Sequence, residues 1–189
     1  MKRFNAIKAI VQKAEDKDSL LICNIGYPSR ELHDLKDRSA NFYMLGSMGL
    51  SSSIGLGVAL SVPDRHVIAI DGDGSVLMNM GSLATIAHQH PENYLLIIID
   101  NGAYGSTGDQ LTATALGTDL AIVAKGAGID EVHNTFSEEE FREKLKNVDR
   151  GVIVVHVDAG NSKVPVIHLT PEKIIERFMS ECARPSMSS

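Results

Sequence analysis

The chain has 189 residues, of which 43% are hydrophobic and 22% charged, and it carries a formal net charge of −6 at pH 7. This balance is typical of a globular protein and argues against a disordered or fibrous chain. An acidic chain lacks the basic face needed to bind a phosphate backbone, so nucleic acid is not an expected partner. No stretch approaches eighteen unbroken apolar residues, so we expect a soluble, cytoplasmic protein without a membrane-spanning helix.

The length is most simply that of one domain. We expect residues 1–184 to form a single α/β domain and residues 185–189 to form a flexible tail. The two cysteines, Cys23 and Cys182, are far apart and have no metal-binding spacing. We therefore expect free thiols rather than a disulfide or a structural zinc site.

Helices and strands alternate in the first third of the sequence. Amphipathic periodicity and proline at a first turn predict helices, whereas short apolar runs predict strands. In chain order we expect a helix over residues 3–14, a strand over 19–24, a helix over 28–35, a strand over 42–45 and a helix over 49–59.

The central part of the sequence has the pattern of a parallel β-α-β unit. A strand over residues 66–70 ends in Asp71-Gly72-Asp73-Gly74, a helix covers 78–89, and a strand over 94–99 ends in Asp100-Asn101-Gly102. Both strands of such a unit finish at the same edge of the sheet. Asp73 and Asn101 should therefore lie side by side, where a carboxylate and an amide oxygen can share one cation.

The last third continues the alternation after a long loop. This loop covers residues 103–117, is rich in Gly, Ser and Thr, and is a candidate active-site segment. We then expect a helix over 119–125, a helix that begins with the capping box of Ser137 and Glu140, a strand over 151–157, and a helix over 170–181 with Ile174, Ile175 and Phe178 buried. Five or six strands alternating with helices predict a doubly wound, mostly parallel sheet whose ligand site lies at the carboxyl ends of the strands.

Charge narrows the chemistry of that edge. No lysine or arginine occurs between Arg65 and Lys125, so this glycine-rich edge has no basic side chain of its own. Yet Gly72, Gly74 and Ser75, placed before a helix, suit the close approach of an anion. A divalent ion can bridge a diphosphate to an acidic loop, and Mg²⁺ prefers such oxygen ligands.

The segment Gly72-Asp73-Gly74-Ser75, followed by Asn101-Gly102, resembles the signature of the thiamine-diphosphate-dependent 2-oxo acid decarboxylase superfamily. The resemblance implies the fold that binds the diphosphate side of the cofactor, with thiamine diphosphate and Mg²⁺ as cofactors. It also implies that Asp73, Asn101 and the main-chain carbonyl of Ala103 are the metal ligands.

An upstream segment resembles the part of the family fold that contacts the pyrimidine side of the cofactor. In the family a bulky apolar residue there supports the bent form of thiamine, and Met48 occupies that place, although without the resemblance it reads as core filler. The cofactor-binding residues implied are Gly46, Ser47, Met48, Gly72, Asp73, Gly74, Ser75, Asn101, Ala103 and Tyr104.

The segment from Asn101 to Gln110, with Thr112 after it, resembles more narrowly the sulfopyruvate and phosphonopyruvate decarboxylases. As a separate chain of this length, the sequence resembles the β subunits of the sulfopyruvate decarboxylases. Hydroxyl and amide groups in this segment could hold an anionic substrate group, although a polar surface loop has the same composition. The candidate substrate residues are Ser106, Thr107, Gln110 and Thr112.

The family needs a glutamate, from a different domain, that protonates the aminopyrimidine ring. We find no glutamate placed for that task here, so no catalytic residue is assigned to this chain. The resemblance implies that a separate α subunit carries the pyrimidine-side domain and supplies this glutamate, and we expect it also to supply any arginine or lysine that binds the substrate anion. The implied reaction is conversion of 3-sulfopyruvate to sulfoacetaldehyde and CO₂, in coenzyme M biosynthesis.

Three alternatives remain open from the sequence. The substrate could be phosphonopyruvate, or the chain could be a cofactor-binding, regulatory subunit without catalytic capacity. A nicotinamide-dependent oxidoreductase is the third, because Gly55-Leu56-Gly57 follows a glycine-rich segment.

Overall fold

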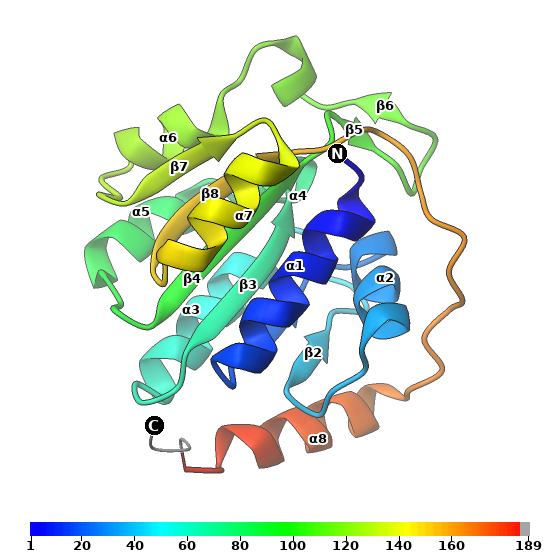
Figure 1. The fold of residues 1–189 in the computed structure, drawn as a ribbon, viewed down its shortest axis with the longest axis vertical. Helices are drawn as coiled ribbons and strands as arrows, with labels where there is room; N and C mark the ends of the chain where they lie inside the picture. Colours follow the sequence, from blue (N-terminus) through cyan, green and yellow to red (C-terminus); the bar gives the residue numbers. More distant parts are fainter. Residues whose placement is uncertain (186–189) are drawn as a thin grey trace.

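A parallel sheet of six strands forms the centre of the molecule (Figure 1). The computed structural model describes residues 1–185, so residues 186–189 of the expected tail lie outside the described part. The strands are β1 (Leu20–Cys23), β2 (Asn41–Tyr43), β3 (Val67–Gly72), β4 (Tyr94–Asp100), β7 (Val132–Thr135) and β8 (Gly151–His156). Their order is β2-β1-β3-β4-β8-β7, with every neighbouring pair parallel. The predicted doubly wound α/β sheet is confirmed.

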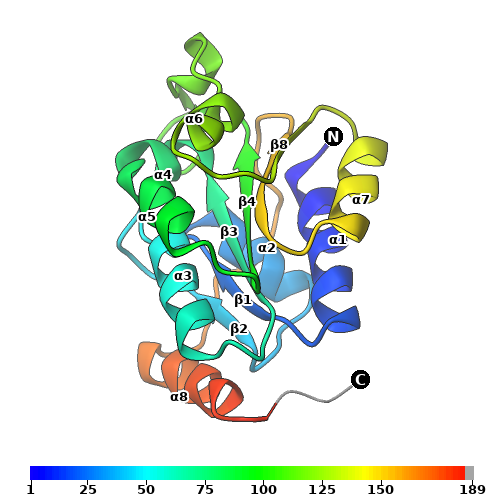
Figure 2. The same ribbon diagram turned by 90° about the vertical axis from the view of Figure 1, so that its left-hand side faces the viewer.

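Helices cover both faces of the sheet. One face carries α1 (Arg3–Asp16), α2 (Tyr27–Leu35) and α7 (Glu138–Asn147), and the other carries α3 (Ser51–Ser61), α4 (Asp73–Met78), α5 (Gly81–Gln89) and α6 (Leu120–Gly126). Figure 2 shows these two layers on opposite sides of the strands. Every helix within residues 1–185 is too short or too polar to cross a bilayer.

The core follows from strands that are buried on both faces. In β3, Val67 and Ala69 pack under α3 and α5, whereas Ile68 and Ile70 pack under α1 and α7. Successive side chains of a strand point to opposite faces, so a central parallel strand needs apolar residues at consecutive positions. This is why β3 and β4 appear in the sequence as unbroken apolar runs. Cys23 is buried among them and Cys182 is also a free thiol, as predicted.

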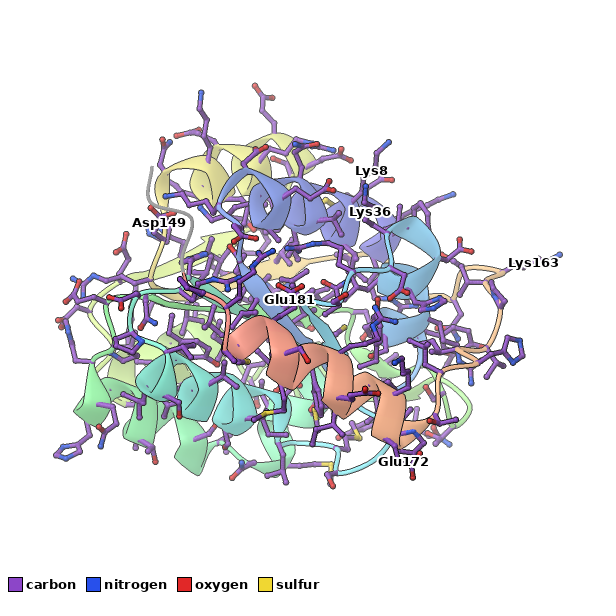
Figure 3. All side chains as sticks on the ribbon, turned by 90° about the horizontal axis from the view of Figure 1, so that it is seen from below. Lys8, Lys36, Asp149, Lys163, Glu172 and Glu181 are labelled. Atoms are coloured by element: carbon purple, nitrogen blue, oxygen red, sulfur yellow. The ribbon has the colours of Figure 1, made fainter. Side chains whose placement is uncertain are left out.

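The last helix, α8 (Pro171–Cys182), packs along the β2 edge of the sheet, where the rings of Phe178 and Phe42 lie 5.4 Å apart. Figure 3 views this helix from below, with Glu172 and Glu181 marking its ends. Ile174 and Phe178, four residues apart, are buried. The prediction for Ile175 was wrong: this side chain is 52% exposed, because it lies one residue round the helix from the buried stripe.

Between β8 and α8, residues 157–170 form a connecting segment, which contains no helix. A single β-bridge joins Asp158 to Lys2, so the segment starts beside the N-terminus of the chain. It then runs along the outside of the molecule, with Lys163 pointing away from it (Figures 1 and 3).

Three local features differ from the sequence-based expectation. Strand β7 was missed because Val-His-Asn-Thr is short and three of its four residues are polar, which an edge strand tolerates. Helix α4 begins at Asp73, so Gly74 and Ser75 lie inside a helix rather than before one. The loop over residues 103–117 contains a small hairpin of β5 (Ala103–Tyr104) and β6 (Gln110–Leu111), followed by the 3₁₀ turn η1 (Thr114–Leu116).

Two glycines of α3 provide a matched test of helix-to-sheet packing. A Cβ atom at Gly55 would approach Cβ of Ala69 to 2.8 Å and the Tyr94 ring to 2.9 Å, whereas a Cβ at Gly57 would meet nothing within 4 Å. We expect Gly55→Ala to lower the free energy of unfolding by about 1–3 kcal/mol through overpacking. Gly57→Ala should raise it by about 0.5–1 kcal/mol through helix propensity. Urea denaturation measures both values, and equal effects would contradict the packing of α3 described here.

Candidate functional site

A pocket opens at the carboxyl edge of the sheet, where β1 and β3 lie side by side. The helix that follows β1 covers one face and the helix that follows β3 covers the other, so the chain diverges at this point. Such a switch point is where doubly wound sheets bind ligands. The pocket has a volume of about 160 Å³, and its wall includes Asp73, Asn101 and Ala103. The structure therefore confirms that the ends of β3 and β4 bring Asp73 and Asn101 together.

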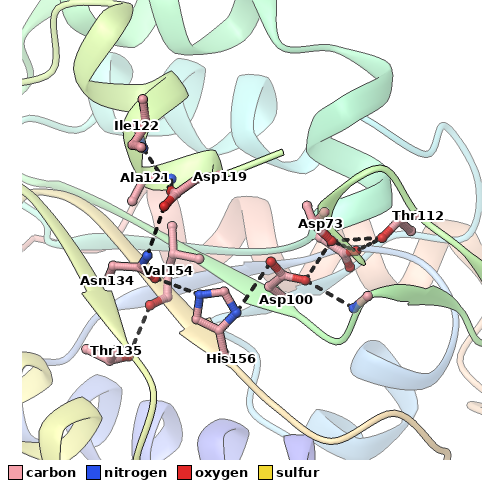
Figure 4. Close-up of polar contacts among 12 residues, drawn as sticks. Asp73, Asp100, Thr112, Asp119, Ala121, Ile122, Asn134, Thr135, Val154 and His156 are labelled. Atoms are coloured by element: carbon pink, nitrogen blue, oxygen red, sulfur yellow. Dashed lines mark hydrogen bonds and ion pairs between the residues drawn. The ribbon is translucent and has the colours of Figure 1, made fainter. Parts of the chain in front are cut away.

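Asp73 is held by two threonine side chains of the 103–117 loop (Figure 4). Oδ2 of Asp73 lies 2.5 Å from the hydroxyl of Thr112 and 3.0 Å from the hydroxyl of Thr114. The Thr114 hydroxyl also lies 2.9 Å from Oδ1 of Asp100. Because each threonine carries one hydroxyl proton, Asp73 and Asp100 share the donor that Thr114 provides.

The electrostatics of this pair favour a bound cation. Asp73 is only 2% exposed and Asp100 only 6% exposed. Burial raises the pKa of Asp73, and the negative charge of Asp100 raises it further, against the opposing effect of the threonine hydroxyls and the Gly74 N–H. A nearby positive ion would favour the charged form of both carboxylates.

The donor atoms at this position fit magnesium. Asp73 and Asn101 offer side-chain oxygens and Ala103 a main-chain carbonyl, whereas no group of three His, Cys, Asp or Glu side chains within residues 1–185 could hold a metal. A site with one carboxylate and few protein ligands is typical of Mg²⁺, which completes its octahedron with phosphate oxygens and water. The residues present therefore fit the ion that the sequence analysis expected.

A second acidic residue, Asp71, fixes the backbone around the pocket. Its buried carboxylate accepts hydrogen bonds from the backbone N–H of Gly72 at 3.0 Å and of Ser52 at 3.3 Å. These contacts tie the end of β3 to the start of α3, and burial raises the pKa of Asp71. The sequence analysis placed Asp71 directly after a strand and missed this role. Two signals were present in the sequence: an acidic residue directly before Gly72-Asp73-Gly74, and a helix after residue 49 without a capping side chain of its own.

The three residues of the 46–48 segment do not all reach the pocket. Met48 lines it beside Asp73 and Ser75. Gly46 and Ser47 instead line a neighbouring apolar groove of about 440 Å³ under α8. The segment is held by a hydrogen bond of 2.9 Å from the Gly49 backbone N–H to the Ser75 hydroxyl. Met48 is thus the member of this segment that the structure places against the pocket.

Gly74 and Tyr104 pack directly against each other. A Cβ atom at Gly74 would collide with the Tyr104 ring, so only glycine fits at that position. Both residues line the pocket, together with Gly72 and Ser75. Among the predicted cofactor-binding residues, the structure therefore brings all except Gly46 and Ser47 to one pocket.

The four candidate substrate residues separate into two pairs. Ser106 and Thr107 line the pocket, as expected of residues that contact a substrate. Gln110 is exposed and bonds to Thr107 instead, with its side-chain N–H 3.0 Å from the Thr107 carbonyl. Thr112 is 1% exposed and donates to Asp73, so the structure places it behind the pocket rather than in it.

Arg3 also lines this pocket, which corrects the expectation of an edge without a basic side chain. That expectation considered only residues 65–125, whereas the bridge between Lys2 and Asp158 brings the start of α1 to the same edge. Arg3 is 7% exposed and pairs with Glu31. A signal was present in the sequence, because Arg3 falls on the same helical face as Ile7, Ile10 and Ala14.

The dinucleotide alternative is not supported. Gly55-Leu56-Gly57 lies in the middle of α3, where Gly55 packs against β3 and Tyr94. In a dinucleotide fingerprint the glycines form the turn between a strand and a helix. These glycines serve helix packing instead.

Comparison with known proteins identifies the class. A family model described as "Thiamine pyrophosphate enzyme, C-terminal TPP binding domain" matches residues 25–157, which include the whole pocket apart from Arg3, Asn24 and Asn161. The chain therefore belongs to the thiamine pyrophosphate enzymes.

Its relatives define the family more narrowly. The chain is 50% identical to "Sulfopyruvate decarboxylase subunit beta" of Methanocaldococcus jannaschii over 97% of this chain and 98% of that protein. It is 42% identical to the sulfopyruvate decarboxylase of Methanosarcina acetivorans, but covers 46% of that protein, and 37% identical to the phosphonopyruvate decarboxylase of Streptomyces viridochromogenes, covering 43%. Within the thiamine pyrophosphate enzymes, this chain belongs to the family of sulfopyruvate decarboxylase β subunits.

A solved structure shows the same fold. The 2-oxoglutarate:ferredoxin oxidoreductase from Magnetococcus marinus matches 87% of this chain and 64% of its own chain, with a TM-score of 0.68 and 18% sequence identity. At this identity the match shows a shared fold.

The shared hydroxyl of Thr114 can be tested without any ligand. Thr114→Val keeps the shape of the side chain but leaves two buried carboxylates with one donor fewer, so we expect the free energy of unfolding to fall by about 1.5–3 kcal/mol. Thr85→Val, on the exposed side of α5, should change it by less than about 0.5 kcal/mol. Chemical denaturation of both variants measures the difference, and a silent Thr114→Val variant would contradict the shared donor.

Proposed function

We propose that this chain is the cofactor-binding subunit of a thiamine-diphosphate-dependent enzyme that decarboxylates 3-sulfopyruvate to sulfoacetaldehyde and CO₂. One observation carries the proposal: Asp73, Asn101 and Ala103 meet in one pocket at the edge of the sheet, in a chain 50% identical to a sulfopyruvate decarboxylase β subunit. This combination favours an intact cofactor site over a regulatory subunit that has lost it.

The residues of this chain bind and orient the cofactor. Asp73, Asn101 and the carbonyl of Ala103 would hold Mg²⁺, which suits a ligand set of hard oxygen atoms, and its charge would offset that of the diphosphate. Gly74 lets the Tyr104 ring form part of the pocket wall, and Met48, which lines the same pocket, supports the cofactor. Bound thiamine diphosphate supplies the electron sink for decarboxylation.

Several features support a separate α subunit that completes the active site. The pocket volume of about 160 Å³ is well below the roughly 300–1,000 Å³ typical of small-molecule sites. No glutamate is found among the described residues of the pocket wall, so the proton donor to the pyrimidine ring comes from elsewhere. The chain also matches only 46% of the M. acetivorans sulfopyruvate decarboxylase, which leaves a second half of similar length for the pyrimidine-side domain.

Exposed apolar side chains on either side of the segment that carries Met48 support the same proposal. Leu45 and Leu50, which are 59% and 41% exposed, line the apolar groove under α8. Met78, 62% exposed, ends α4 next to Gly49, and Met80, 42% exposed, follows two residues later. Exposed apolar groups gathered next to an incomplete site are typical of a protein–protein interface. The α subunit covers this surface and closes the pocket from outside.

The first test is reconstitution. We expect neither this chain alone nor the purified α subunit alone to release CO₂ from 3-sulfopyruvate, and their mixture to do so in the presence of thiamine diphosphate and Mg²⁺. A coupled assay of CO₂ release measures this, and 3-phosphonopyruvate assayed in parallel decides between the two acids. Activity of this chain alone, or activity of the mixture without thiamine diphosphate, would contradict the proposal.

The second test concerns the metal ligand. Asp73→Ala removes the single carboxylate among the proposed ligands, so we expect binding of thiamine diphosphate with Mg²⁺ to weaken at least tenfold, about 1.4 kcal/mol or more. Isothermal titration calorimetry of the complex measures the affinity. Asp130→Ala, at an exposed position beside His90, is the control and should bind normally. Equal affinity of the Asp73→Ala and control complexes would favour a subunit whose cofactor site is elsewhere.

A further inference from the structure

Arg3 is the one cationic side chain among the described residues that line the pocket. It comes from the first turn of α1, outside residues 25–157 that match the family model. At 7% exposure it is nearly as buried as the core. A buried arginine needs a partner for its charge, and each of its N–H groups needs an acceptor.

Glu31 is the partner for the charge of Arg3. Its Nε and Nη2 atoms each lie 2.9 Å from one carboxylate oxygen of Glu31, which is 1% exposed. Nη2 also lies 3.1 Å from Oδ1 of Asn161. The Tyr27 ring lies under the guanidinium, 5.9 Å from its carbon to the ring centre. This side-on pair fixes the plane of the guanidinium and involves one edge, formed by Nε and Nη2, so the Nη1 amino group remains for another acceptor.

The same cluster is tied to the loop that carries the candidate substrate residues. The side-chain N–H of Asn161 donates to the carbonyl of Gly105 at 2.8 Å, directly before Ser106. The Ser162 N–H donates to Glu31 at 3.3 Å, so two residues of the connecting segment hold the pair. Arg3, Ser106 and Thr107 line the same pocket, and a hydrogen bond from Asn161 to Gly105 joins the cluster of Arg3 to the loop that carries the two hydroxyl groups.

We propose that Arg3 recognises the tetrahedral anionic group on carbon 3 of the substrate through its Nη1 amino group, with Ser106 and Thr107 as further donors. This inference rests on the proposed function, and it assigns to this chain a role that the sequence left to the α subunit. In the proposed function Mg²⁺ would neutralise the diphosphate, so a second anion in the same pocket needs N–H donors of its own. Sulfonate and phosphonate are both tetrahedral anionic groups whose oxygens can accept hydrogen bonds from Arg3.

The role of Glu31 follows from the same geometry. It balances the charge of Arg3, so the guanidinium contributes directed N–H groups rather than a net positive charge. In pyruvate carbon 3 is an uncharged methyl group, which offers no acceptor to these N–H groups. Arg3 thereby determines specificity for the anionic substrate and leaves cofactor binding to the metal ligands.

The test compares variants of the reconstituted complex. Arg3→Met combined with Glu31→Met removes the pair without leaving an unpaired buried carboxylate. Arg3→Lys is the second variant, because it keeps the charge next to Glu31 but lacks the Nη1 group. The matched control is Arg177→Met combined with Asp37→Met, a bidentate pair between α8 and the segment before β2 with distances of 3.0 and 2.8 Å.

Kinetics with 3-sulfopyruvate and 3-phosphonopyruvate give KM for each variant. Pyruvate, which lacks the sulfonate or phosphonate group on carbon 3, serves as a comparison substrate or competitive inhibitor. Isothermal titration with sulfoacetate reports binding of a sulfonate without turnover. For both Arg3 variants we expect KM for 3-sulfopyruvate, and the dissociation constant of sulfoacetate, to rise about 10- to 100-fold. Affinity for pyruvate, and half-saturation by thiamine diphosphate and Mg²⁺, should stay within about twofold of the control.

Three outcomes would overturn the role of Arg3. The first is sulfonate affinity within about twofold of the control, which indicates a purely structural ion pair. The second is an equal loss of affinity for 3-sulfopyruvate and pyruvate, and the third is a loss confined to thiamine diphosphate. If sulfoacetate binds the unmodified complex, binds the Arg3 variants more weakly, and 3-sulfopyruvate is not decarboxylated, the inference is supported and the proposed function is contradicted. The two failures are therefore distinguishable.

Discussion

Two buried carboxylates that share one hydroxyl donor are the constraint on which this site depends. Asp73 directly follows β3, Asp100 ends the neighbouring strand β4, and the Thr114 hydroxyl lies 3.0 and 2.9 Å from one oxygen of each. Parallel pairing of β3 with β4 brings them together, and burial denies them the water that would otherwise solvate both charges. Asp100 also accepts from the Gly102 N–H at 3.0 Å and lies 3.6 Å from Nδ1 of His156, whereas no lysine or arginine is paired with Asp73 among the described residues. In the function proposed above, a divalent cation at Asp73 would stabilise this arrangement and bind an anionic ligand at the same time.

Much of this arrangement could be predicted from the sequence, because it depends on topology. Two apolar runs separated by a helix-length segment imply parallel neighbours, and parallel neighbours imply that Asp73 meets Asn101. The missed features depend on contacts between distant parts of the chain. Asp71 caps a helix that starts twenty residues earlier, and Arg3 reaches the pocket only because the N-terminus pairs with the segment after β8. Strand β7 is defined by its pairing with β8, since three of its own four residues are polar.

The same topology explains why a well-formed domain holds an incomplete site. The carboxyl ends of parallel strands offer loops, glycines and short polar side chains, which suit the diphosphate and its metal. They provide no wall for the other end of a cofactor that protrudes from the sheet. A pocket of about 160 Å³ is small for a whole cofactor, as expected if another domain forms the rest of the site in the function proposed above. In the M. acetivorans relative the matching region is less than half of one longer chain.

The position of Glu31 shows how such a pocket can hold an arginine before any ligand arrives. An arginine buried alone would lose its hydration without compensation, which costs several kcal/mol. Glu31 offsets this cost by accepting from the Nε and Nη2 edge, while the opposite edge of the guanidinium remains a donor. Lysine cannot divide its donors in this way, because it presents a single ammonium group. In the function and inference proposed above, the free N–H groups of Arg3 would bind one anion and a metal ion held by Asp73 would bind the other, so an acidic chain could bind two anionic molecules side by side.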